Sequence, residues 1–239
     1  MKRATLIITI LILLLNTTTI LAAPGFEMGF NRLQSKYQLN DSFSERMVLK
    51  ELIGGVNLDS GLSLQASYTF GDYDNYLDAN LKEVNLKLTK DFLFSPEKKL
   101  ALGIAGNYSN FTTSIFSQKL FNIESQGLDL VVDLEKRLTE RIGLFANGGY
   151  NLAGRYQIDS PLLNNNLEQL TNYEINSDYY LQTGFKFKLA PQLKFRFGYK
   201  ISRENIKNKD FNNLKIDAYN LSEVNILKQG IFFGAETKF

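Results

Sequence analysis

Apolar and polar residues alternate along most of the chain after residue 24, with the period of two that is typical of β-strands with one apolar face. The stretch 61–72 is the clearest example. Its apolar positions are Leu62, Leu64, Ala66, Tyr68 and Phe70, and its polar or small positions are Ser63, Gln65, Ser67, Thr69 and Gly71. The same alternation recurs in 174–189, where Leu181 is on the apolar face and Gln182 on the polar face, and in 192–206, where Phe197 is on the apolar face and Gly198 on the polar face. Helical periodicity is hard to find, and no segment in this part of the chain is apolar enough for a transmembrane helix.

Turn-forming residues divide this alternating sequence into segments. Short connections are predicted at 59–61, 95–98, 138–140 and 190–191; Gly, Pro, Ser or Asp occurs in three of them, and 138–140 is Leu-Thr-Glu. Longer polar connections are predicted at 39–45, 72–80, 112–124, 157–173 and 207–220. Ten strands result, at approximately 25–38, 46–58, 61–72, 81–94, 99–111, 125–137, 141–156, 174–189, 192–206 and 224–239.

Short turns that alternate with long loops are typical of a transmembrane antiparallel up-and-down β-barrel. An even strand number puts both ends of such a barrel on the short-turn side. The alternative is a secreted β-sandwich or a soluble ligand-binding barrel with its Phe/Leu face inside. Against it stand the length of the strands and a polar face rich in Gly, Ser and Asn, which suits a crowded barrel interior. The predicted fold class is therefore all-β, a transmembrane barrel of about ten strands.

The N-terminus has the layout of a secretory signal peptide. Lys2 and Arg3 precede an apolar run over 6–15, and small residues follow at Ala22 and Ala23. We predict a signal peptide at 1–22 and a barrel domain at 23–239. A retained membrane anchor is the alternative, but the apolar run is shorter than the ~20 residues that span a bilayer.

Charge changes the picture once the signal peptide is removed. Of 27 basic and 25 acidic residues, Lys2 and Arg3 are the only charges within 1–22, so the predicted mature chain is formally neutral. No basic excess then favours a nucleic-acid partner.

The C-terminal strand carries the most specific resemblance. Phe239 ends the chain, Ala235, Phe233 and Ile231 share its face, and Gly234 lies five residues earlier. This end resembles the C-terminal assembly signal of bacterial outer-membrane barrels, although Thr237 and Phe232 depart from its usual pattern. The mature chain as a whole resembles the outer-membrane β-barrel superfamily of small opacity-type and porin-like barrels. The resemblance implies a location in the cell outer membrane, with membrane lipid and the barrel assembly machinery as partners.

The polar face of the predicted strands holds charges of both signs. They are Asp129, Asp133, Glu135, Arg137, Lys186, Lys188, Lys194, Arg196, Lys200, Glu236 and Lys238. Inside a narrow barrel these residues first suggest a salt-bridge network that fills the lumen. A selective passage for a small charged solute is a second hypothesis, and catalysis by paired carboxylates is a third. Two lysines, Lys50 and Lys90, fall on the predicted lipid face, and we expect both near strand ends, where the cost is small.

The composition removes most enzyme classes. The chain contains no Cys and no His, so thiol nucleophiles and the commonest general base and metal ligand are absent. Barrel proteases of the omptin type, barrel lipases and barrel deacylases generally depend on a catalytic His. We therefore predict a non-enzymatic outer-membrane barrel without cofactor or metal, with a structural or surface-interaction role through long extracellular loops. The alternative is a narrow passive porin for small solutes, and the ligand of the loops stays open.

Overall fold

The computed structural model describes residues 25–39, 43–58, 60–74, 78–95, 97–115, 118–159, 170–208, 215–216, 219–220 and 223–239. The predicted signal peptide at 1–22 lies outside these residues and stays a prediction. Within the described part of the chain, no helix is long and apolar enough to cross a membrane.

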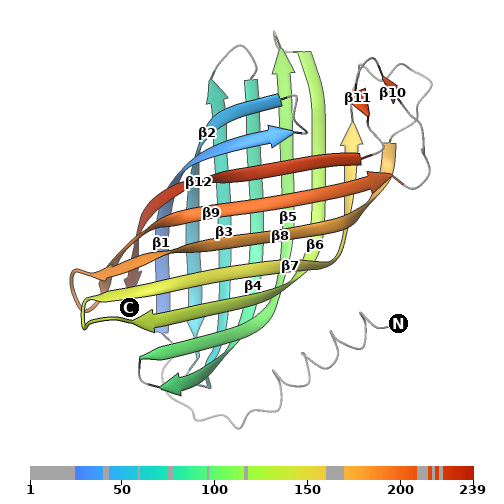
Figure 1. Ribbon diagram of the computed structural model, residues 1–239. Coiled ribbons are helices and arrows are strands. Elements are labelled where there is room, and N and C mark those ends of the chain that lie inside the picture. The colour runs from blue at the N-terminus through green and yellow to red at the C-terminus, as the bar shows by residue number, and fades with distance from the viewer. Residues whose placement is uncertain are drawn as a thin grey trace.

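Ten long strands form one closed antiparallel barrel (Figure 1). They are β1 (Gly25–Leu39), β2 (Phe43–Asn57), β3 (Leu62–Asp74), β4 (Asp78–Ser95), β5 (Lys98–Ile115), β6 (Gln118–Arg137), β7 (Ile142–Asp159), β8 (Leu170–Lys188), β9 (Leu193–Asn208) and β12 (Glu223–Lys238). Each strand pairs with its neighbour in sequence, and β12 closes the barrel by pairing with β1. Two short strands, β10 (Lys215–Ile216) and β11 (Tyr219–Asn220), pair only with each other. The prediction of a ten-stranded up-and-down barrel is confirmed.

The strands are strongly tilted, because the pairing is staggered around the barrel. Starting at Arg196 on β9 and stepping from partner to partner through β12, β1 and the remaining strands, the path returns to β9 at Asn208. A stagger of this kind is what closes a sheet into a barrel, and it fixes the tilt of the strands relative to the barrel axis. Residues on strands distant in sequence therefore come to the same height inside the lumen.

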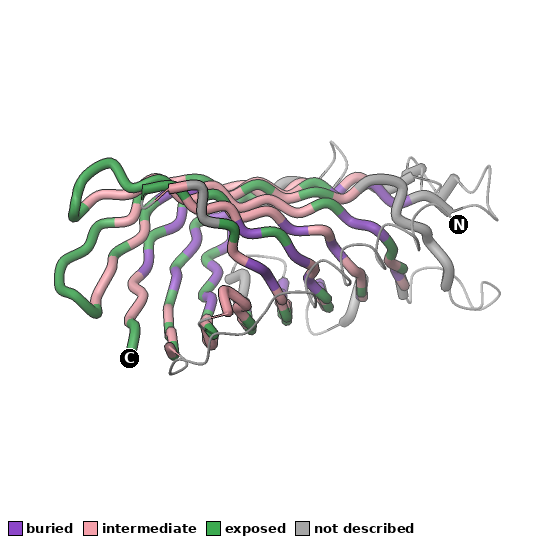
Figure 2. The backbone as a smooth tube through the Cα atoms, turned by 90° about the horizontal axis from the view of Figure 1, so that it is seen from below, coloured by how far each residue is buried: buried purple, intermediate pink, exposed green. Residues whose placement is uncertain are grey.

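Exposure alternates along each strand, as the green, pink and purple segments of Figure 2 show. Leu64, Leu181 and Phe197 are each about half exposed, so large apolar side chains cover the outer surface. Ser67 and Gln182 line the interior, and Gly198 is buried. The predicted assignment of lipid-facing and lumen-facing positions is therefore confirmed at these six positions.

Three of the five predicted long loops are wrong. β1 ends at Leu39 and β2 begins at Phe43; β3 ends at Asp74 and β4 begins at Asp78; β5 ends at Ile115 and β6 begins at Gln118. The prediction failed because outward-facing positions become polar in these stretches, as at Thr112 and Glu124, while the strand ladder continues. The long connections are those between β7 and β8 and between β9 and β12.

Candidate functional site

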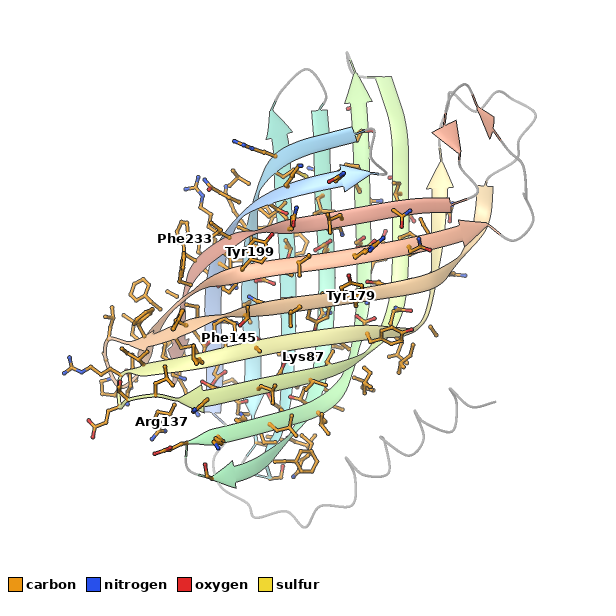
Figure 3. The ribbon with its side chains drawn as sticks, in the orientation of Figure 1. Lys87, Arg137, Phe145, Tyr179, Tyr199 and Phe233 are labelled. Atoms are coloured by element: carbon orange, nitrogen blue, oxygen red, sulfur yellow. The ribbon has the colours of Figure 1, made fainter. Side chains whose placement is uncertain are left out.

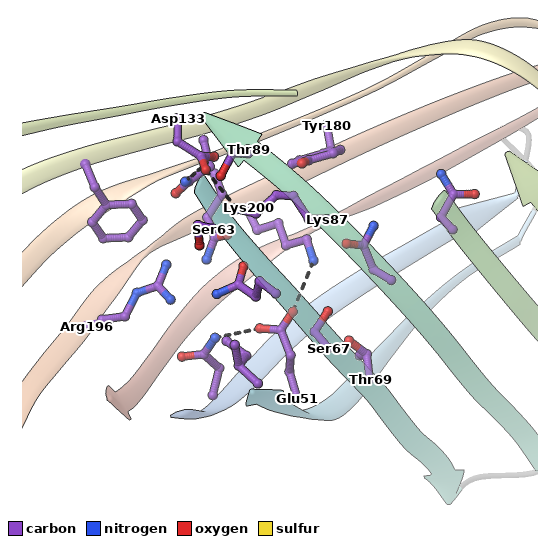
Figure 4. A pocket seen from close by; sticks show the side chains of 18 of the residues that line it. Glu51, Ser63, Ser67, Thr69, Lys87, Thr89, Asp133, Tyr180, Arg196 and Lys200 are labelled. Carbon is purple, nitrogen blue, oxygen red and sulfur yellow. Dashed lines mark hydrogen bonds and ion pairs between the residues drawn. The ribbon is translucent and has the colours of Figure 1, made fainter. Parts of the chain in front are cut away.

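The barrel encloses a cavity of about 1030 Å³. One wall carries small side chains, among them Ser63, Ser67 and Thr69 of β3, and this leaves space in the lumen. Longer side chains such as Lys87, Tyr180 and Lys200 line the same cavity (Figure 4). The lumen is therefore neither empty nor densely packed, and the placement of its charged groups decides what it can do.

Two ion pairs lie in the middle of the lumen. Lys87 Nζ of β4 lies 2.9 Å from Asp133 Oδ2 of β6, and Asn147 Nδ2 donates to Asp133 Oδ1 over 2.7 Å. Lys200 Nζ of β9 lies 4.0 Å from Glu51 Oε1 of β2, and Asn31 Nδ2 donates to Glu51 Oε2 over 2.5 Å. Both carboxylates thus have an amide donor as well as a cation, which offsets part of their desolvation.

A second cluster lies nearer the long connections and crosses the lumen. Lys228 Nζ of β12 lies 2.6 Å from Glu83 Oε1 of β4 and 3.0 Å from Glu204 Oε1 of β9. The Tyr156 hydroxyl of β7 donates to Glu204 Oε2. Because β1, β2 and β3 lie between β12 and β4 on one side of the ring, the Lys228–Glu83 pair bridges facing walls.

A third cluster, nearer the short turns, combines aromatic rings with a cation. The Arg196 guanidinium lies 4.7 Å from the ring centroid of Phe145 and 6.0 Å from that of Phe232. The two rings lie 6.0 Å apart, although Phe145 belongs to β7 and Phe232 to β12. Cation–π contacts of this kind stabilise a cation more strongly when it is shielded from water. Lys186 also contacts the Phe145 ring, at 5.6 Å.

The structure brings most of the predicted lumen charges together. Glu135 pairs with Lys186 at 3.1 Å, and Glu236 with Lys194 at 3.7 Å and with Arg196 at 3.8 Å. Asp129 accepts hydrogen bonds from Asn107 and Asn151 instead of pairing with a lysine or arginine of the described residues. The remaining three, Arg137, Lys188 and Lys238, are exposed at the short-turn ends of β6, β8 and β12.

Several lumen residues were not identified from the sequence. Glu83 and Lys87 alternate with Val84, Leu86 and Leu88, so the period of two could have found them. The same period places Phe145 and Phe232 on the lumen face, opposite Leu144 and Phe233, but their residue type did not suggest a lumen role, because aromatic residues of a barrel strand are typical of the lipid face. Across the described residues, no group of three or more His, Cys, Asp or Glu side chains is arranged to hold a metal ion.

The two predicted assembly residues lie where β12 closes the barrel against β1. A Cβ on Gly234 would collide with the Asn31 side chain and the Phe30 carbonyl oxygen. Phe239 N donates to the Phe26 carbonyl oxygen over 2.9 Å, and its side chain is 71% exposed. Gly234 therefore permits close approach of the two strands, and Phe239 ends the seam with an exposed ring.

The outer wall has an apolar band with tyrosines along one side. Tyr68, Tyr108, Tyr150, Tyr179 and Tyr199 are exposed on the outer face, on the long-connection side of residues such as Leu64, Phe185 and Phe197. Figure 3 labels Tyr179, Tyr199 and Phe233 on this wall, and Phe145 and Lys87 on the lumen side. An apolar band flanked by aromatic residues is the surface that a transmembrane barrel presents to lipid.

No protein-family model matches the chain, and no curated protein matches it either. Among solved structures, the chain is similar to the outer membrane protease OmpT from Escherichia coli, with 11% identity, a TM-score of 0.57, and coverage of 95% of this chain and 100% of that one. It is also similar to the translocator domain of the autotransporter NalP from Neisseria meningitidis, with 9% identity, a TM-score of 0.52, and coverage of 100% of this chain and 95% of that one.

At such low identity, these similarities establish the fold. The chain has the fold of the bacterial outer-membrane β-barrels. The apolar outer band and its tyrosines agree with that fold. The described part of the chain is therefore a ten-stranded β-barrel of this fold, with an apolar outer surface suited to contact with lipid.

Proposed function

We propose that this protein is a non-enzymatic outer-membrane barrel with a blocked lumen, and that it acts as a structural or surface-interaction element. The observation that carries the proposal is the set of contacts across the lumen. Lys228 bridges β12 and β4 on the long-connection side. Arg196 contacts the rings of Phe145 and Phe232 on the short-turn side. Contacts at two levels favour a closed barrel over an open diffusion channel.

The interaction surface is the end of the barrel that carries the connections after β7 and β9. The other connections at this end are short, so interaction through long loops is restricted to these two segments and the rims of the extended strands. We also propose that the exposed Phe239 and the β1–β12 seam serve recognition by the barrel assembly machinery, since the final strand is the closing edge. The absence of His supports the non-enzymatic assignment, because the typical omptin-type protease depends on that residue.

Planar-bilayer conductance of refolded protein tests the proposal. We expect no steady open-channel current from the wild type. The double variant Lys228→Ala/Glu83→Ala, combined with Arg196→Ala, should produce frequent channel openings, because it removes bridges at both levels. Glu140→Ala/Arg141→Ala removes one charge of each sign from an exposed turn and should behave like the wild type.

A steady, ohmic, large conductance of the wild-type protein would overturn the blocked-lumen proposal. In that case the narrow passive porin for small solutes, which the 1030 Å³ cavity supports, becomes the better assignment.

A further inference from the structure

Four basic residues form a cluster on the outer wall of the barrel: Arg32 and Lys36 on β1, and Arg46 and Lys50 on β2. All four are exposed, and they alternate with the lumen-facing residues of their strands. We name them the outer basic cluster. Lys90, which was also predicted on the lipid face, differs from them because its ammonium donates to the Ser60 carbonyl oxygen in the short turn after β2.

The register places like charges directly opposite each other. Arg32 pairs with Lys50, and Lys36 pairs with Arg46. Side chains at directly opposite positions of an antiparallel pair have their Cβ atoms ~4.5–5.5 Å apart, and like charges there are destabilising. In the described part of the chain, none of the four has a carboxylate partner. The arrangement therefore creates an uncompensated positive field on the outer wall.

The cluster does not lie at a strand end, as was expected for Lys50. Lys50 is in the middle of β2, and its ammonium lies 5.9 Å from the ring centroid of Phe70 on β3. Tyr68 is paired with Leu52, two residues from Lys50, so the cluster begins beside the tyrosine girdle. Tyrosines in such girdles lie at the level of the lipid headgroups. The cations thus start at the depth at which lipid phosphates occur and continue toward the long-connection end.

We propose that the outer basic cluster binds the phosphate groups of a phosphorylated glycolipid in the outer leaflet. A phosphate between Arg32 and Lys50 would neutralise their repulsion and accept charge-assisted hydrogen bonds from both. The second pair, Lys36 and Arg46, lies four residues further along each strand and provides a second phosphate position. The neighbouring Phe30, Val48 and Leu52 provide apolar wall for the acyl chains.

A second copy of this chain fits the cluster less well. The outward-facing side chains described on the ten barrel strands include a single carboxylate, Glu124 of β6. A complementary acidic face is therefore missing from the described wall. The inference also does not depend on whether the lumen conducts, because none of the four residues faces the cavity.

Native mass spectrometry of the refolded full-length barrel with diphosphoryl lipid A tests this inference. We expect Arg32→Gln/Lys50→Gln to reduce the affinity about tenfold, which corresponds to ~1.4 kcal/mol. The matched control is Lys98→Gln/Lys136→Gln, which removes another pair of directly opposite lysines at the short-turn end. The control should keep the wild-type affinity. An equal loss in both variants, or no loss in either, would overturn the inference.

Two further measurements separate lipid phosphate from other ligands and from a structural role. Lipid A with its phosphates removed should bind to the wild type as weakly as diphosphoryl lipid A binds to the variant, and millimolar inorganic phosphate should not compete. Without lipid A, Arg32→Gln/Lys50→Gln should be more heat-resistant than the wild type, because the repulsion is gone; with lipid A the order should reverse. Competition by inorganic phosphate, or an unchanged order of stability, would refute the lipid assignment.

Discussion

Asp133 illustrates how individual lumen residues are held. Its carboxylate has Lys87 on one oxygen and Asn147 on the other, and the side chains of Lys87 and Asp133 are only 15% and 21% exposed. A partner removed from such a pair leaves the other charge with little solvent to replace it. The charges of a lumen ion pair are therefore interdependent. Removing one partner should destabilise the barrel more than removing both.

Asp133→Ala should lower the temperature at which the folded barrel loses its heat-modifiable gel mobility. Breaking a buried pair typically costs ~3–5 kcal/mol, and water in the cavity should reduce this value. The double variant Lys87→Ala/Asp133→Ala should recover part of the loss, because no unpaired charge remains. A single variant as stable as the wild type would contradict the pairing, as would a double variant no more stable than the single one.

At the level of strands, packing between β8 and β9 depends on two glycines that face each other. Gly184 and Gly198 are partners in the register. A Cβ on Gly198 would collide with the Thr183 carbonyl oxygen and would lie 2.9 Å from Phe232 Cε1. The absence of side chains here lets Phe232 of β12 extend over β9 toward Phe145, so the glycines also make room for the aromatic contact inside the lumen.

Gly198→Ala should therefore destabilise the barrel, by the ~1–3 kcal/mol typical of overpacking. The measurement is the urea midpoint of unfolding from lipid vesicles. Gly106→Ala is the matched control, because a Cβ on Gly106 of β5 has no atom within 4 Å. The free energy of unfolding of this control should stay within ~0.5 kcal/mol of the wild-type value, as is typical of neutral surface changes, so its urea midpoint should hardly move. Equal midpoints for the two variants would show that the close approach of β8 and β9 is not required.

For the whole molecule, the alternation of side chains along each strand sets which residues face lipid and which face the aqueous lumen. On β3, Leu64 is 46% exposed on the outer wall, while Ser67 lines the cavity three residues away. The same substitution at these two positions should thus meet lipid in one case and an aqueous, charged lumen in the other. This contrast tests the membrane orientation of the entire wall.

Leu64→Arg should reduce insertion into lipid vesicles, because Arg on the lipid face costs ~2–4 kcal/mol near the midplane. Ser67→Arg should insert more efficiently, since Ser67 lines the same polar cavity as the carboxylates of Glu51 and Asp133. The folded fraction, measured by gel mobility without heating, checks both variants. If both variants insert equally well, or if Ser67→Arg is the worse of the two, the assigned faces are reversed or irrelevant.

Much of the fold follows from the sequence alone. Alternation and turn chemistry predicted the strand number, the antiparallel order and the two faces, because a strand has a side-chain period of two and each face meets one environment. The same local signal failed at 39–45, 72–80 and 112–124. Polar outward positions there were interpreted as loops, whereas the strands continue.

Tertiary structure alone decided which residues meet across the lumen. Lys228 and Glu83 are 145 residues apart in sequence, and Arg196, Phe145 and Phe232 come from three different strands. Their meeting depends on the stagger with which the barrel closes, and on the positions where glycine lets strands approach. The pattern along the sequence gives the face on which each residue lies. It does not give the residue's height along the barrel axis, because that height depends on the tilt and stagger of the strands. The opposition of Arg32 and Lys50 has the same origin, since both outward positions are evident from the alternation and only the register sets them side by side.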